Sequence, residues 1–229
     1  MGVESVDRQA QAVAIPSGTV AILRDGTAGV EVLMVRRPHS DRDAFSGQWV
    51  FPGGKVDDSD RGGDDSEVAL AARAAVRETM EEVAIKISVD ALVALNRWEP
   101  KPPKPLPKIF SAWLFLARDV GGKPLIDGEE IVDHGWKSPS DMLGLRNAGE
   151  LKLSPPTWHT LTALSSHADV DSVISWAGAR EPERFLSQGG QQDGHSLIVW
   201  HGDAQVDGGE NDRHRLWMID NDWRYERNV

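Results

Sequence analysis

Cysteine is absent from the 229-residue chain, which excludes disulfide bonds, thiolate zinc sites and cysteine nucleophiles and fits a reducing compartment. Positive charge is also scarce, since 25 Lys and Arg residues face 36 Asp and Glu residues, for a net charge of -11. A chain with this balance does not favour a broad electrostatic grip on nucleic acid or on an anionic membrane. A polyanionic ligand would need a local arrangement of charge.

Long hydrophobic runs are missing as well. The longest apolar stretches, such as AWLFLA at Ala112–Ala117, have the length of a strand and fall short of the roughly 20 residues that a bilayer requires. The polar, acidic beginning of the chain does not resemble a secretion signal, and the final Arg-Asn-Val is not a peroxisomal address. We therefore expect a cytoplasmic protein that binds neither membrane nor nucleic acid.

The order of predicted elements indicates an α+β fold. Residues 17–25 and 30–37 alternate like the two strands of an antiparallel hairpin. The acidic segment 57–65 (DDSDRGGDD) predicts an exposed loop, after which a helix begins near Ser66 and ends at about Val83. Strands are expected near 85–98 and 109–118, on either side of a stiff, proline-rich connector. This order predicts an α/β/α sandwich with a mixed sheet.

The length suits one generous domain with an extension. We expect the main domain to comprise residues 1–150. Residues 151–229 are expected to form an extension packed on it, with a helix that begins at Ser154 and Pro155 followed by short strands. The diglycines at Gly189 and Gly208 are interpreted as loops. The extension could cap the sheet, shape a pocket or pair two subunits of a homodimer, and a monomer is equally compatible with the sequence.

The most informative stretches are FPGGKV at Phe51–Val56 and RETMEEVAI at Arg77–Ile85. On a helix, Glu78, Glu81 and Glu82 stand at i, i+3 and i+4 and share one side. Neighbouring like charges repel by roughly 0.2–0.5 kcal/mol per pair, which a hard divalent cation would offset.

The glutamates alone are also typical of an ordinary solvated helix face, with Val76, Met80 and Val83 on the side that faces the core. The preceding glycines favour the metal site. They allow a ligand to approach the backbone closely and offer a carbonyl oxygen as a further hard donor.

Taken together, the two stretches resemble the signature of the Nudix hydrolase family. That signature is a glycine, five residues, a glutamate, seven residues, Arg-Glu, an aliphatic residue, any residue, Glu-Glu, any residue, a glycine and an aliphatic residue. The positions that match are Gly54, Arg77, Glu78, Glu81, Glu82 and Ile85. With the flanking hairpin and the later EEIVDHGWKSPSDML, the resemblance covers residues 14–145.

The chain departs from the signature in three respects. Between Gly54 and Arg77 there are 22 residues where the signature has 13, so about nine are extra, and segment 57–65 is their natural place. The position eight before Arg77 is Ala69, with Glu67 nearby but out of register, and the late glycine and first aliphatic residue are Ala84 and Thr79. An insertion here makes the chain most similar to the coenzyme A diphosphatase-like branch of the family.

The resemblance implies a metal-dependent hydrolase that splits a phosphoanhydride in a nucleoside diphosphate linked to another moiety. Glu78, Glu81 and Glu82 would bind Mg2+ or Mn2+ together with the Gly54 carbonyl, and Arg77 would orient a glutamate of the same helix. A general base would come from the later acidic loop, at Glu129 or, as we predict, Glu130. Its alternative is an ordinary turn.

The positive residues Arg36, Arg37, Arg42 and Lys55 surround the glycine turn in sequence and could hold a phosphate, with solvated surface charge as the alternative. Trp98, Trp113 and Trp136 could stack on a substrate ring, but burial in the core is the commoner fate of tryptophan.

Coenzyme A derivatives, ADP-ribose and dinucleotides such as NADH all remain open as the small-molecule substrate. Because Ala69 replaces a motif glutamate, the alternative to an enzyme is a Nudix-like nucleotide-binding or regulatory module that has lost turnover.

Overall fold

The computed structural model describes residues 13–40, 45–101, 108–126 and 128–229. Its helices are α1 (Glu67–Val83), α2 (Pro139–Asn147), α3 (Pro155–Leu164) and α4 (Val170–Gly178), with single 3-10 turns at Asp58–Asp60 and Val89–Ala91. Its strands are β1 (Val13–Gly26), β2 (Gly29–Arg36), β3 (Trp49–Val50), β4 (Gly53–Lys55), β5 (Val93–Pro100), β6 (Lys108–Arg118), β7 (Asp133–Lys137), β8 (Glu183–Gln192), β9 (His195–Val199), β10 (His214–Ile219) and β11 (Asp222–Arg227).

The eleven strands of the described chain form one mixed sheet in the order β11-β10-β9-β8-β5-β6-β1-β2-β3, with β4 paired to β1 and β7 paired to β2. The predicted hairpin is confirmed, since β1 and β2 pair antiparallel from Leu23 opposite Val32 to Gly26 opposite Gly29. The parallel pairs are β1 with β6 and β5 with β8. The predicted α+β fold with a mixed sheet is therefore confirmed.

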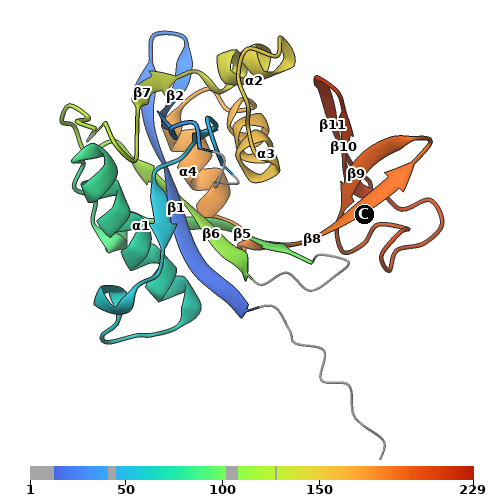
Figure 1. Cartoon of the computed structure of the whole chain (residues 1–229), viewed down its shortest axis with the longest axis horizontal. Coiled ribbons are helices and arrows are strands. Elements are labelled where there is room, and N and C mark those ends of the chain that lie inside the picture. The colour runs from blue at the N-terminus through green and yellow to red at the C-terminus, as the bar shows by residue number, and fades with distance from the viewer. Residues whose placement is uncertain (1–12, 41–44, 102–107, 127) are drawn as a thin grey trace, which may run out of the picture.

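Helices cover both faces of the central strands (Figure 1). Helix α1 lies on one face over buried Val20, Ile22 and Phe115, while α2, α3 and α4 lie on the other face over a second apolar cluster. Gly18 permits the close approach of α1 to β1, because a Cβ there would lie 1.9 Å from the Ala71 carbonyl oxygen. The position of α1 against β1 therefore depends on a residue without a side chain.

Helix α1 has the predicted limits. Ser66 is its N-cap residue, although its hydroxyl donates to Asp64 and does not cap the helix. The helix ends at Val83, and the C-cap residue Ala84 adopts a left-handed conformation with φ +56° and closes the last turn through its N–H to the Met80 carbonyl. The family signature has glycine here because that conformation costs a residue with a Cβ more energy.

Several expectations for the rest of the chain were wrong. The strand predicted at 85–98 begins only at Val93, after the 3-10 turn at Val89–Ala91. Helix α4 and strand β8 were not predicted, and Gly189 lies within β8 instead of marking a loop. The prolines at 102, 103, 105 and 107 of the predicted stiff connector lie outside the described residues.

Residues after α4 continue the sheet. Strand β8 pairs parallel with β5, from Asn96 opposite Glu183 to Pro100 opposite Ser187, and β9, β10 and β11 follow as an antiparallel meander. This part of the sheet stands at the right of Figure 1, beside α3. Within the described ranges, no helix has the length and apolarity that crossing a bilayer requires.

Candidate active site

The glycine turn lies directly against α1. Strand β4 pairs with β1, with Gly54 opposite Gly18 and Gly53 opposite Thr19. Gly53 has φ +144°, and its N–H donates to Glu82 Oε2 at 3.0 Å. A Cβ on Gly54 would lie 2.4 Å from Glu78 Oε1, so the Glu78 carboxylate occupies the space that a side chain would fill. Because the two glycines have no side chains, the carboxylates of Glu78 and Glu82 can lie directly against the backbone of the turn.

The surroundings of these two carboxylates disfavour their ionised, negatively charged forms. Glu82 is 3% exposed, and burial raises its pKa to about 7, with a further contribution from the charge of Glu78. Burial also raises the pKa of Glu78, against the opposing effect of Arg77. Glu130 lies near enough for its charge to add to both increases. The site has more negative charge than its own residues compensate.

Arg77 links the elements around these glutamates. Its Nη1 donates to Glu78 Oε1 at 3.0 Å and to Glu81 Oε2 at 2.9 Å, while its Nη2 donates to the Lys55 carbonyl at 2.9 Å. Its Nε and Nη2 also form a fork on Asp60, with both distances at 3.1 Å. All five N–H groups of the guanidinium are thus used, and they join α1, the glycine turn and the inserted loop.

Asp60 was missed by the sequence analysis, which predicted that segment 57–65 would be exposed throughout. Its side chain is 3% exposed, and it also accepts a hydrogen bond from the Asp57 N–H at 2.9 Å in a capping box. A signal was available, because Asp60 follows Gly54 after five residues, as the signature's glutamate does. Counting back from Arg77 gave Ala69 because the extra residues lie between Asp60 and Arg77.

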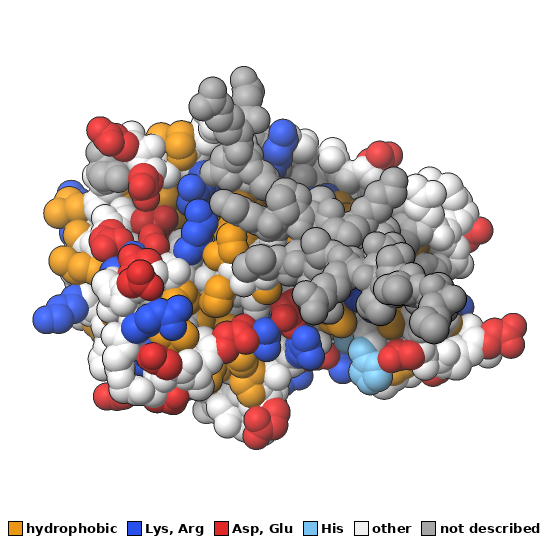
Figure 2. Space-filling model, turned by 60° about the horizontal axis from the view of Figure 1, so that its bottom comes forward, with side chains coloured by type: hydrophobic (Ala, Val, Ile, Leu, Met, Phe, Trp, Pro, Cys, Tyr) orange, Lys and Arg blue, Asp and Glu red, His pale blue; other side chains and the backbone are white. Residues whose placement is uncertain are grey.

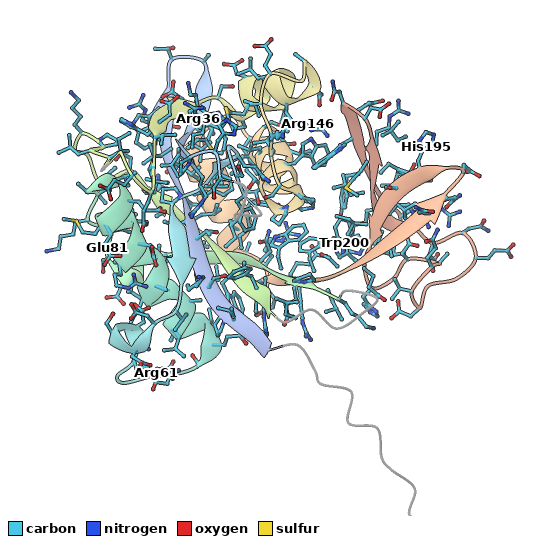
Figure 3. The ribbon with its side chains drawn as sticks, in the orientation of Figure 1. Arg36, Arg61, Glu81, Arg146, His195 and Trp200 are labelled. Atoms are coloured by element: carbon cyan, nitrogen blue, oxygen red, sulfur yellow. The ribbon has the colours of Figure 1, made fainter. Side chains whose placement is uncertain are left out.

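The glutamates of α1 do not all face the same way. The Glu81 side chain is 58% exposed and reaches the group only through Arg77. Figure 3 places it on the outer side of α1, and Arg61 at the tip of the inserted loop. Met80, expected to face the core, is 50% exposed, whereas Thr79 is fully buried and donates to the Ala75 carbonyl. Glu78 and Glu82 are therefore the pair next to the glycine turn.

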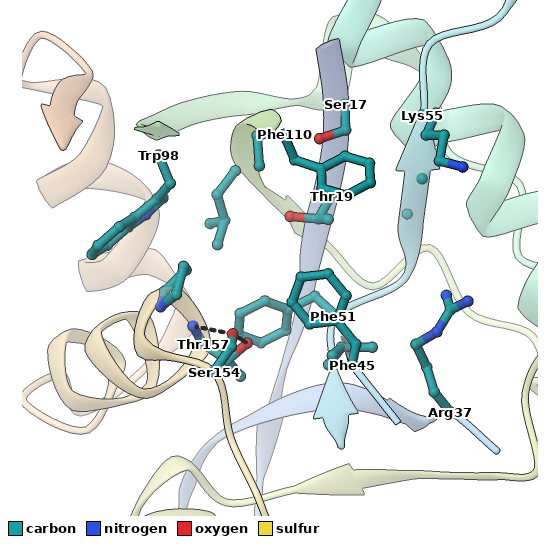
Figure 4. Close-up of a pocket in the computed structure, with 16 residues that line it drawn as sticks. Ser17, Thr19, Arg37, Phe45, Phe51, Lys55, Trp98, Phe110, Ser154 and Thr157 are labelled. Atoms are coloured by element: carbon teal, nitrogen blue, oxygen red, sulfur yellow. Dashed lines mark hydrogen bonds between the residues drawn. The ribbon is translucent and has the colours of Figure 1, made fainter. Parts of the chain in front are cut away.

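A pocket of about 530 Å3 opens beside this turn (Figure 4). One end carries Arg37 and Lys55, next to Gly53 and Gly54. The rest is lined mainly by apolar and aromatic side chains and by hydroxyl groups, namely Phe45, Val50, Phe51, Trp98, Phe110, Ala112, Leu114, Pro156, Ser17, Thr19, Ser154 and Thr157. Among the lining residues that the structure describes, none is acidic. The pocket therefore has a cationic end and an apolar end.

The structure separates the other predicted site residues. Arg37 and Lys55 line the pocket, whereas Arg36 forms an ion pair with Asp133 at 3.4 Å across β2 and β7. Arg42 lies outside the described residues. Glu67 does not replace the missing motif glutamate at Ala69, because it binds Arg97 and Ser111, each at 2.8 Å.

The three candidate tryptophans have different surroundings. Trp98 is 4% exposed and lines the pocket from within the core. Trp113 stacks near Phe115 on the α1 side, and Trp136 lies under the Arg24 guanidinium at 4.3 Å. Packing against other side chains therefore explains the positions of Trp113 and Trp136, and of the three tryptophans it is Trp98 that lines the pocket.

On the face shown in Figure 2, acidic, basic and hydrophobic side chains lie close together over the end that carries α1. The donor set at Glu78, Glu82 and the glycine turn fits a hard divalent cation, because oxygen ligands and uncompensated charge are what Mg2+ or Mn2+ requires. No three acidic or histidine side chains within the described ranges are already grouped around one point that could hold an ion.

Comparison with known proteins identifies the family and the fold of this chain. A family model described as the NUDIX domain matches residues 15–157, more than half of the chain. The crystal structure of a NUDIX hydrolase from Alicyclobacillus acidocaldarius is similar with a TM-score of 0.63 at 24% identity, covering 72% of this chain and 97% of that one.

The NUDIX domain of Shewanella oneidensis NrtR, solved with ADP ribose, is similar with a TM-score of 0.50 at 16% identity, covering 69% of this chain and 90% of that one. The comparison with curated proteins found no match.

The fold, the motif helix and the family match define a metal-using class of pyrophosphohydrolase. This chain belongs to the Nudix hydrolase family, whose enzymes act on nucleoside diphosphate derivatives and generally use divalent metal ions.

Proposed function

We propose that this enzyme hydrolyses the phosphoanhydride bond of a nucleoside diphosphate linked to a second moiety, with Mg2+ or Mn2+ bound at α1. The observation that carries the proposal is the position of the Glu78 and Glu82 carboxylates against Gly53 and Gly54, at the cationic end of the pocket. This arrangement supports a diphosphate at Arg37 and Lys55 with one of its substituents in the apolar part.

Glu78, Glu81 and Glu82 would hold the metal with the carbonyl of Gly54. When bound, the metal would reverse the local negative charge, polarise a phosphorus atom and lower the pKa of a bound water. Arg77 keeps Glu78 and Glu81 in position through its Nη1, since their distances of 3.0 and 2.9 Å are those of charge-assisted hydrogen bonds. Asp60 in turn holds Arg77.

Glu130 is our candidate general base. Its charge acts on both Glu78 and Glu82, which supports a place beside the reacting phosphate, and it lies on an exposed loop that a water can reach. Arg37 and Lys55 would bind the outer phosphate oxygens. The ion pair of Arg36 with Asp133 supports a structural role for that residue instead.

The second candidate function is a nucleotide-binding or regulatory module without turnover. The observation that favoured it was Ala69 in place of a motif glutamate. Asp60 weakens that argument, because this buried carboxylate is separated from Gly54 by five residues, as the signature's glutamate is, and binds Arg77. Coenzyme A derivatives, ADP-ribose and NADH stay open as substrates, and the closeness to the coenzyme A diphosphatase-like branch stays a prediction.

The test is a product assay on ADP-ribose, NADH and coenzyme A with Mg2+ or Mn2+, run on the wild type, Glu82→Gln and Glu81→Gln. Removing a metal ligand should lower kcat/KM by about 100-fold or more for Glu82→Gln. Glu150→Gln, an exposed glutamate outside the site, is the control. Full activity of Glu82→Gln, or activity that is indifferent to chelation of the metal, would contradict the assignment.

The remaining predictions concern the whole chain. We propose that residues 151–229 are an extension of the Nudix domain and not an independent domain, which is supported by the pairing of β8 with β5 in one sheet. Expression of residues 151–229 alone should give an unfolded chain by circular dichroism. The cytoplasmic location and the choice between monomer and homodimer stay predictions.

A further inference from the structure

Strand β11 is the last strand at one end of the sheet, next to β10 in the strand order. It pairs antiparallel with β10, from Ile219 opposite Asp222 to His214 opposite Arg227. Within the described ranges, no strand pairs with its other side. An edge of this kind presents a row of backbone N–H and C=O groups with which another strand can pair. The extension thus ends in an open template for a further strand.

A hydrogen bond just after β11 shows which of its residues direct their backbone groups outward. Asn228 donates its N–H to the Arg213 carbonyl at 3.0 Å, in the same register as the β10–β11 pairs. Residues of an antiparallel pair alternate between bonded and non-bonded positions. The even-numbered residues of β11 therefore bond to β10, and the odd-numbered residues direct their N–H and C=O groups away from it. These outward groups belong to Trp223, Tyr225 and Arg227.

Charged side chains alternate in sign on the exposed side of β11. Asp222, Arg224 and Glu226 are all exposed, and Arg224 forms an ion pair with Asp222 of its own strand. Trp223 and Tyr225 point to the other side of the strand, where they pack against the buried apolar cluster. The edge therefore carries a negative, a positive and a negative charge in a row, beside its outward backbone groups.

We infer that β11 pairs antiparallel with β11 of a second copy of this chain, centred on Tyr225, so that the sheets of two copies join across a two-fold axis. In this register the outward backbone groups of the two strands face each other, and Arg224 of each copy stands opposite the partner's Glu226. Oppositely charged side chains at directly opposite positions stabilise an antiparallel pair. The inference goes beyond the proposed function and does not depend on it.

The charges disfavour the neighbouring registers that also bring outward backbone groups together. A centre on Arg224 sets it against the partner's Arg224 and sets Asp222 against the partner's Glu226. A centre on Glu226 likewise brings two glutamates together. A centre on Trp223 pairs Asp222 with the partner's Arg224, but it leaves the second half of each strand without a partner. The register centred on Tyr225 combines extensive overlap with opposite charges, which is how an edge strand can select one partner and one register.

The test is sedimentation velocity of the full chain over a range of concentrations. A pair of six-residue strands is a small interface, so we expect a dimer that dissociates on dilution. The variants are Arg224→Glu and Glu226→Arg, each studied alone and in an equimolar mixture of the two. They change the net charge in opposite directions, so an effect of net charge cannot weaken both. Arg61→Glu is the control, because Arg61 is an exposed arginine of the inserted loop.

The wild type should approach the mass of two chains at high concentration. Each variant alone should raise the dissociation constant about tenfold or more, because both Arg–Glu contacts become contacts between like charges. The mixture should recover a value close to that of the wild type, since each contact between the two different variants again joins opposite charges. Arg61→Glu should leave the dissociation constant unchanged.

Four results would overturn the inference. They are a wild type that stays monomeric at its highest soluble concentration, a dimer that neither β11 variant weakens, a mixture that does not recover, and an Arg61→Glu protein that dissociates as readily as the β11 variants. If only Arg224→Glu weakens the dimer, the contact would be the one centred on Trp223, and the register inferred here would be wrong.

Discussion

Two buried aspartates, one in the motif region and one in the extension, bind an arginine in the same way. Asp60 receives Nε and Nη2 of Arg77 at 3.1 Å each, and Asp203 receives Nε and Nη2 of Arg215 at 2.7 Å each. The aspartates are 3% and 0% exposed. Both pairs therefore have the planar fork geometry that makes Arg–carboxylate contacts directional.

The remaining donors of the two arginines go to different groups. Arg77 directs its other N–H groups to Glu78, Glu81 and the carbonyl of the glycine turn, so it connects the inserted loop to charged residues at the pocket. Arg215 donates to the neutral Gln192 side chain. The same Asp–Arg pair thus positions a site when the arginine also contacts residues of that site. When the arginine contacts other groups, the pair only stabilises the fold.

Asp203 also binds the backbone of its own surroundings. Its carboxylate accepts from the N–H of His214 at 2.9 Å and of Gln205 at 2.9 Å, which ties the loop before β10 to the strand. Every contact of this pair that is described here stays within the extension. Perturbing the two pairs should therefore separate effects on stability from effects on catalysis.

The largest effect should come from Asp203→Asn. Removing one partner of a buried ion pair leaves an uncompensated charge and costs about 3–5 kcal/mol of the free energy of unfolding. Urea unfolding measures that loss. The kcat of the folded fraction, measured at low temperature, should stay within twofold of the wild type. A tenfold fall in kcat would mean that this pair also supports the site.

Asp60→Asn should affect kcat more than Asp203→Asn does, and stability less. The change weakens the fork on Arg77, so we expect about 1–3 kcal/mol less stability and a kcat lowered about tenfold or more. Asp58→Asn, two residues away and fully solvent-exposed, is the matched control and should change neither quantity. An Asp60→Asn enzyme with normal kcat would reduce this pair to the bracing role of Asp203 and Arg215.

A pH-dependent effect on stability is expected from His159 in the extension. Burial lowers its pKa to about 4, with His214, Arg227 and Arg180 adding unfavourable positive charge. Between these two pKa values, His159 is protonated in the unfolded chain but neutral in the folded chain. The free energy of unfolding therefore falls as pH drops from about 6.5 to about 4. The loss should reach about 3 kcal/mol and level off below pH 4.

His159→Phe keeps an aromatic ring beside Trp98 and Phe185 but cannot be protonated. Urea unfolding between pH 7 and pH 4 should show a shallower loss of stability for this variant than for the wild type. Identical pH dependence of the two proteins would place the responsible proton elsewhere. His214, whose pKa burial also lowers, would be the next residue to test.

The smallest effect concerns the end of the motif helix. Because Ala84 holds a left-handed conformation and is exposed, Ala84→Gly should relieve strain and raise the free energy of unfolding by about 1 kcal/mol. Ala72→Gly, inside the same helix, should lower it by about 1 kcal/mol. Thermal denaturation of both variants checks the opposite signs. A loss of stability in Ala84→Gly would show that no strain is relieved there.

Much of the motif region was predictable because its signals are short-range. Alternating residues and a turn specify the β1–β2 hairpin, and the spacing of Glu78, Glu81 and Glu82 follows from the helical period. Even there, the relative positions of the carboxylates depended on packing. Glu82 turns to Gly53, 29 residues earlier, while Glu81 stays in solvent.

The extension was less predictable. Helix α4 is short, and β8 includes the sequence Gly-Gly, which favours loops over strands. Its strand character comes from pairing with β5, whose partner residues lie more than 80 positions earlier in the chain. Sequence patterns within a window of about ten residues cannot predict a partner that is so distant in the chain.

The local composition and periodicity of this chain were enough to specify a mixed α+β fold, the limits of α1 and a set of glutamates beside a glycine turn, because each depends on neighbours within a few residues. Folding in three dimensions was needed to select Asp60 for Arg77, to leave Arg36 outside the pocket and to bring Phe185 onto Trp98. These contacts join distant segments, and their partners follow from strand order and packing instead of spacing.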